Sequence, residues 1–163
     1  MEKSLAIANE MIRRGIINNA TPTQMKLQKL IYFAHGWHLA LYDQPLVDEA
    51  FYAWPYGPVI PSVYHKFKAF GVLGINQFGL EYFISADEKV ESSMPQINDL
   101  GIVLPLCDKI WEVFGGYSGN QLSEMTHVEN SPWKIVRDKY HGVRDILIPN
   151  DLIKDYFKGL MPQ

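Results

Sequence analysis

The sequence predicts a mainly α-helical fold of about seven helices with one small two-stranded antiparallel β element. Residues 21–42 carry the clearest helical pattern, because roughly twenty residues follow Pro22 without another proline. Helical spacing of apolar residues, or helix start and stop signals, recurs over 3–15, 62–71, 102–114, 118–127, 131–140 and 151–160. Two compact runs, Ala50–Trp54 and Asp145–Ile148, are typical of strands that could pair.

The first two helices are predicted from their apolar faces and their ends. The amphipathic segment 3–15 is expected to end at Gly15. The segment 21–42 can be capped by the hydroxyl of Thr21 or Thr23, and it is apolar on two faces. A helix of this kind is normally packed on more than one side, so we expect residues 21–42 to run through the core.

A stiff corner follows the second helix. Pro55, Pro58 and Pro61 exclude a long helix there, and Pro61 suits the first turn of a helix that closes at Gly71. Residues 72–100 are polar and interrupted by proline, so they are predicted to be a variable loop or insertion in which 80–85 could form a strand.

The helices of the C-terminal half are predicted mainly from their boundaries. The apolar face that begins at Ile102 stops at Gly115-Gly116, and Ser131-Pro132 begins a later helix. Asn150 is predicted to cap the last one.

Composition limits the classes of protein that this chain can be. A length of 163 residues suits one domain over 1–163, and a net charge of −3 gives no general attraction for nucleic acid or an anionic membrane. The single cysteine, Cys107, cannot form an internal disulfide, which favours the cytoplasm. No apolar run is long enough to span a membrane, and we expect the chain to be entire.

The candidates for catalysis or metal binding are weak. His35 and His38 lie three residues apart on the predicted core helix, and His65, His127 or His141 could complete a metal site. Hydrogen-bonded structural histidines are much commoner, so no metal or other cofactor is predicted. The motifs of serine hydrolases, P-loop proteins and dinucleotide-binding proteins are absent, and Cys107 has the surroundings of a buried apolar side chain.

Two groups of residues suit either a structural role or a partner. Lys26 and Lys29 interrupt the apolar core helix, and their ammonium groups could reach water, a nearby carboxylate or an acidic partner. The aromatic residues between Phe51 and Tyr64 could fill the core or form a binding hot spot on the proline-braced corner.

The run KLQKLIYFAHGWHLALYDQPLVDEAFYAWPYGPVIPSVYHKFKAFG resembles the SocA-like antitoxin domain, also called Panacea, which occurs in phage-associated genes and toxin–antitoxin pairs. The shared pattern is a K-L-x-K-L-x-Y helix, a P-L connection, an A-W-x-Y-G-P-V turn and a Tyr-containing helix closed by Gly. The downstream L…T-H…W segment and the ending IPNDLIKDYF are also similar to the family. The residues that match this pattern are Lys26, Leu27, Lys29, Leu30, Tyr32, Pro45, Leu46, Ala53, Trp54, Tyr56, Gly57, Pro58, Val59, Tyr64, Gly71, Leu122, Thr126, His127 and Trp133.

This resemblance implies a helical, non-enzymatic domain that neutralises a toxin encoded beside it through direct contact. No membrane and no nucleic acid are expected as partners. The candidate partner-binding residues are Lys26, Lys29, Tyr32, Trp54, Tyr56 and Tyr64. The residues assigned to building the motif are Gly57, Pro58, Thr126, His127 and Trp133.

Three other functions fit parts of the sequence. The protein could be an adaptor that delivers its partner to a protease. It could be a small hydrolase or transferase that uses His35, His127 and Asp48 or Glu49. Binding of DNA by the first two helices is disfavoured by the net charge.

Overall fold

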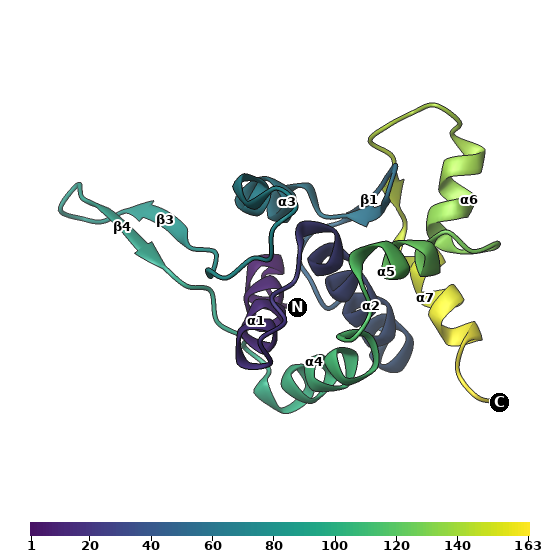
Figure 1. The fold of residues 1–163 in the computed structure, drawn as a ribbon, viewed down its shortest axis with the longest axis horizontal. Helices are drawn as coiled ribbons and strands as arrows, with labels where there is room; N and C mark the ends of the chain where they lie inside the picture. Colours follow the sequence, from purple (N-terminus) through teal and green to yellow (C-terminus); the bar gives the residue numbers. More distant parts are fainter.

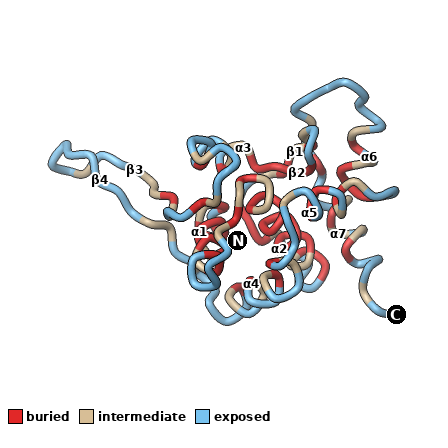
Figure 2. Tube along the Cα trace, in the orientation of Figure 1, coloured by how far each residue is buried: buried red, intermediate tan, exposed pale blue.

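The computed structural model describes residues 1–163 and is organised around the central helix α2, Gln24–Tyr42. Thirteen of the nineteen residues of α2 are buried, which confirms that this helix is packed on more than one side. Its first turn is capped by the Thr23 hydroxyl, which accepts from the Lys26 N–H at 3.3 Å. Figure 1 shows α2 between the other helices, and Figure 2 shows the buried residues gathered around it.

Six further helices complete the predicted mainly α fold. Helices α1, α3, α4, α5 and α7 pack against α2, while α6 packs against the strands. One cluster of 29 buried residues receives side chains from all seven helices. None of the helices is both long enough and apolar enough to cross a membrane. The helices other than α2 are α1 Ser4–Ile17, α3 Pro61–Phe67, α4 Leu100–Phe114, α5 Gly119–Thr126, α6 Pro132–Lys139 and α7 Asn150–Gly159.

A small antiparallel sheet lies beside the helices. Strand β1, Phe51–Trp54, pairs with β5, Leu147–Ile148, and the register places Phe51 opposite Ile148. This confirms the predicted pairing of the two distant runs. The sheet has a third strand, β2, Gly57–Val59, because the chain turns back after Trp54 and the strand order becomes β2-β1-β5.

The segment predicted as a variable loop contains a second sheet. Strands β3, Glu81–Ile84, and β4, Val90–Ser93, form a separate antiparallel hairpin that projects away from the helices (Figure 1). The possible strand at 80–85 therefore exists, and its partner is a polar run that carries little strand signal of its own.

Three predicted helix boundaries are wrong. The helix expected to close at Gly71 ends at Phe67 and is followed by a 3₁₀ turn over Lys68–Phe70. Helix α1 continues past Gly15 to Ile17. Gly15 lies inside the helix, where it leaves room for Pro22, since a Cβ there would lie 2.6 Å from Pro22 Cδ. Asn150 does not cap α7: the N-cap position is Pro149, and no side chain caps it. The Asn150 amide oxygen instead lies 2.9 Å from His35 Nε2.

Gly36 allows α7 to approach α2. A Cβ on Gly36 would lie 2.3 Å from Phe157 Cε2, and the Phe157 ring is itself held by Tyr32 and Trp37. We expect Gly36→Ala to lower the free energy of unfolding by about 1–3 kcal/mol, as overpacking does, despite the better helix propensity of Ala. Denaturant titration measures this change. Gly159→Ala in α7 is the control, since its Cβ would meet nothing within 4 Å; an equal effect of the two substitutions would contradict the packing argument.

Candidate functional site

The tight turn between β1 and β2 presents the aromatic residues of the corner. Pro55 and Tyr56 form its tip, and Trp54 is paired with Gly57 across it. Gly57 has φ +117°, and a Cβ there would lie 2.5 Å from Lys29 Cε and 2.8 Å from Thr126 Oγ1. Only glycine satisfies both the backbone conformation and this close approach.

Helices α5 and α6 hold the turn in place through hydrogen bonds to its backbone carbonyls. The Ser123 hydroxyl donates to the Tyr56 carbonyl at 2.6 Å, and the Trp133 indole N–H donates to the Trp54 carbonyl at 2.6 Å. Thr126 donates in turn to the Ser123 carbonyl at 2.7 Å. The turn is thus fixed by hydrogen bonds to groups that the chain brings from far away in sequence.

Lys29 is buried beneath this turn and has no carboxylate partner. Its side chain is 1% exposed, and Nζ donates to the Pro58 carbonyl at 3.4 Å. Burial lowers the pKa of Lys29 to about 7. The ammonium group therefore reaches neither water nor an acidic side chain, contrary to both structural options that the sequence left open.

His127, at the C-terminal end of α5, also lies near Lys29. Its ring stacks on Trp133 with centroids 3.8 Å apart and planes 12° from parallel. Burial, together with the nearby charge of Lys29, lowers the pKa of His127, and its buried Nε2 atom has no hydrogen-bond partner. His127 and Trp133 therefore lie beside the β1–β2 turn, and the residues of that turn belong to the same sequence motif.

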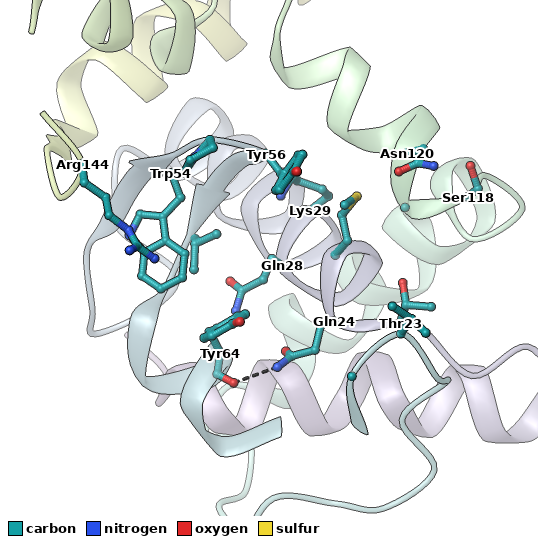
Figure 3. A pocket seen from close by; sticks show the side chains of 16 residues that line it. Thr23, Gln24, Gln28, Lys29, Trp54, Tyr56, Tyr64, Ser118, Asn120 and Arg144 are labelled. Atoms are coloured by element: carbon teal, nitrogen blue, oxygen red, sulfur yellow. Dashed lines mark hydrogen bonds between the residues drawn. The ribbon is translucent and has the colours of Figure 1, made fainter. Parts of the chain in front are cut away.

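A groove of about 600 Å³ opens beside the turn. Figure 3 shows Trp54 and Tyr64 on one side, Ser118 and Asn120 on the other, and the start of α2 between them. The residues that line the groove include two cations and no carboxylate. They are Thr23, Gln24, Met25, Gln28, Lys29, Trp54, Pro55, Tyr56, Val59, Tyr64, Gly71, Val72, Ser118, Gly119, Asn120 and Arg144.

The aromatic wall of the groove is held in place. The Trp54 and Tyr64 rings meet edge to face with centroids 5.1 Å apart, and the Trp54 indole donates to Asp145 at 2.9 Å. The guanidinium of Arg144 lies 5.4 Å from the centre of the Trp54 ring. Tyr56, by contrast, is 69% exposed at the tip of the fixed turn.

The groove also contains an unpartnered polar atom. The Gln24 amide donates to the Tyr64 carbonyl at 2.7 Å, as the dashed line in Figure 3 shows, but its oxygen has no partner. Gln28 is fully paired, because it both accepts from the Ile60 N–H and donates to the Ile60 carbonyl. The two glutamines lie four residues apart, so they share one face of an otherwise apolar helix. This spacing indicates a polar strip, which was not recognised from the sequence.

The structure brings together four of the six candidate partner-binding residues. Lys29, Trp54, Tyr56 and Tyr64 line the groove, although Lys29 is buried at its floor. Lys26 does not line it: its ammonium donates to the Gly115 carbonyl and lies 5.4 Å from the centre of the Trp111 ring on α4.

Tyr32 also lies outside the candidate surface. It is 2% exposed, and its ring packs against Phe51 and Phe157 at 5.3 and 5.7 Å. Burial raises the pKa of its hydroxyl. We therefore place Tyr32 in the aromatic core, where no partner can reach it without unfolding α2 from its neighbours.

The histidines and carboxylates that were candidates for hydrolysis are not hydrogen-bonded to one another. His35 contacts Asn150 through Nε2 and accepts from the Val47 N–H through Nδ1, and burial lowers its pKa to about 4. Asp48 accepts from Ser4, and Glu49 accepts from the Ser62 hydroxyl. Neither carboxylate is paired with His35 or with His127.

The only thiol is equally enclosed. Cys107 is 0% exposed on α4, and burial raises its pKa to about 12. It is therefore a protonated, inert core side chain at neutral pH, as its apolar neighbours in the sequence suggested.

Replacing the buried ammonium should change the pH dependence of stability. Between about pH 7 and 10.5 the unfolded chain keeps the proton of Lys29 and the folded chain releases it, so the free energy of unfolding rises with pH. Lys29→Met should remove this slope and stabilise the protein by about 1–4 kcal/mol at pH 6. Denaturant titrations from pH 6 to 10 measure both effects.

The exposed Lys68 provides the matched control. Lys68→Met should leave the slope of stability against pH unchanged. A Lys29→Met protein that is less stable than the parent at every pH would contradict the assignment of a costly buried charge.

Comparison with known proteins identifies the family. The model of the family described as "Antitoxin SocA-like, Panacea domain" matches residues 27–134, which include the turn, Lys29 and most of the residues that line the groove. The chain is 32% identical over 133 residues to Antitoxin SocA from Caulobacter vibrioides (strain NA1000 / CB15N), covering 80% of this chain and 68% of that protein. No solved structure matches the chain. The chain therefore belongs to the SocA-like, Panacea-domain family of antitoxins.

Proposed function

We propose that this protein neutralises a cognate protein toxin by direct contact at the groove beside the β1–β2 turn. The observation that carries the proposal is that Trp54, Tyr56 and Tyr64, three residues of the family's motif, line one groove of about 600 Å³. A member of an antitoxin family has a toxin as its natural partner.

The chemistry of the groove suits recognition of a protein segment. Trp, Tyr and Arg are the residues that most often dominate binding energy at protein interfaces, and Trp54, Tyr56 and Arg144 lie together here. The hydrogen bonds from Ser123 and Trp133 fix the turn before a partner arrives. A preformed site loses less conformational entropy on binding, which favours affinity.

A binding role without catalysis is also consistent with the polar groups of the core. His35 uses both ring nitrogens in structural contacts, and Cys107 is protonated and enclosed. The groove contains no carboxylate that could act as a general acid or base beside its cations.

Tyr56 is the residue through which the proposal is tested most directly. Because its side chain is exposed and its backbone is held by Ser123, Tyr56→Ser should leave the fold intact and weaken binding of the toxin by about tenfold or more. The product of the neighbouring gene serves as the toxin, and isothermal titration calorimetry measures the affinity. Tyr42→Ser is the matched control, since Tyr42 is 45% exposed at the end of α2 and does not line the groove.

Co-expression distinguishes neutralisation from its alternatives. The proposal expects the neighbouring product to be toxic alone, to co-purify with this protein and to keep its normal lifetime while its toxicity disappears. A shortened lifetime would indicate delivery to a protease instead of masking. A neighbouring product that is harmless and does not co-purify would overturn the proposal.

A further inference from the structure

The β3–β4 hairpin is a second exposed surface that the groove does not explain. It stands away from the helices, and Figure 2 shows it exposed along most of its length. The sheet has only these two strands, so both of its outer edges are unpaired. Its contacts with the helices are confined to its base, where Lys3 pairs with Glu81 at 2.6 Å and Lys66 donates to the Leu80 carbonyl at 2.8 Å. The Asn9 amide also accepts from the Gly79 N–H at 2.7 Å and donates to the Gly79 carbonyl at 2.9 Å.

One face of the hairpin is apolar. The register places Tyr82 opposite Ser92 and Ile84 opposite Val90, and opposed residues share a face of an antiparallel pair. Tyr82, Ile84 and Val90 therefore lie on the same side, where they are 66%, 74% and 75% exposed. An isolated two-stranded hairpin is only marginally stable in water, so an apolar face on it gains most from being covered.

The same hairpin carries a concentrated negative charge. Residues 81–93 contain four carboxylates and one lysine, a formal charge of −3 that equals the net charge of the whole chain. Only Glu81 among these carboxylates is paired with a cation from outside the hairpin. A second copy would bring an identical acidic hairpin, and an anionic membrane would repel it as well. Charge complementarity therefore favours a basic protein surface.

We propose that the apolar face of the β3–β4 hairpin docks on an apolar patch of the toxin that is bordered by lysine or arginine side chains. The proposal rests on the proposed function for the identity of the partner. Helix α3 links the two surfaces, because Tyr64 lines the groove while the Lys66 ammonium lies 5.6 Å from the centre of the Tyr82 ring. The hairpin would thus extend the contact that begins at the groove.

Two sets of substitutions test the hairpin with the neighbouring gene product as the probe. Combining Tyr82→Ser, Ile84→Ser and Val90→Ser should weaken binding at least tenfold, because the apolar face is lost. Combining Asp87→Lys and Glu88→Lys, at the exposed tip between the two strands, should also weaken binding. The parent protein should lose affinity as salt rises from about 50 to about 500 mM, and this variant should lose less, because salt screens exposed charges.

Matched controls separate these effects from general changes in solubility or charge. Ile17→Ser with Val128→Ser removes exposed apolar side chains elsewhere. Glu112→Lys on α4 with Glu129→Lys in the α5–α6 connection makes the same change in net charge away from the hairpin. Both controls should bind like the parent. Thermal unfolding should show the same Tm for the parent and the hairpin variants, because the substituted side chains lie outside the core cluster.

The outcomes distinguish this inference from the proposed function. If the parent binds the toxin and both sets of hairpin variants bind equally well, the hairpin proposal is overturned while the groove proposal stands. If the parent does not bind at all, the proposed function itself fails. If sedimentation shows a dimer of the parent that the apolar-face variant loses, a second copy occupies the hairpin and the assignment of the toxin is wrong.

Discussion

The burial of α2 on several faces is the constraint on which the other parts of the structure depend. Helices α1, α4, α5 and α7 and strand β2 all pack against this one element. Apolar side chains cover most of its surface, so removing any neighbour would expose a large apolar area to water. The close approach of α7 at Gly36 and of the β1–β2 turn at Gly57 shows that this packing fixes backbone as well as side chains.

The few polar groups of α2 connect this packing to the candidate site. Gln24, Gln28 and Lys29 each donate to a carbonyl in the segment from Pro58 to Tyr64. A buried donor that lost its acceptor would pay the full cost of desolvation, so these bonds favour a single position of the turn and of α3. The hydrogen bonds of the buried polar side chains of α2 therefore help to determine the shape of the groove.

The groove and the hairpin differ in how they are supported. The β1–β2 turn beside the groove is held by hydrogen bonds from α5 and α6 to the carbonyls of Tyr56 and Trp54. The hairpin is anchored only at its base and carries its apolar residues in water. The first arrangement suits a preformed recognition site, and the second suits an element that gains order from a partner.

The sequence by itself determined the mainly helical class, the core position of 21–42 and the pairing of the runs near Phe51 and Ile148. Local signals carry this information, since apolar periodicity, capping hydroxyls and prolines act within a few residues. It also placed Trp54, Tyr56 and Tyr64 on one stiff corner, where the structure finds them lining the groove.

Only the tertiary structure decided which motif residues are accessible. Lys29 and Tyr32 were candidate partner-binding residues because they belong to the family motif, but neighbours from α5, α7 and the β1–β2 turn bury them. Asn150 leaves its expected cap because His35, 115 positions away, offers a buried partner. These outcomes depend on contacts between distant segments, and no periodicity within one segment encodes them.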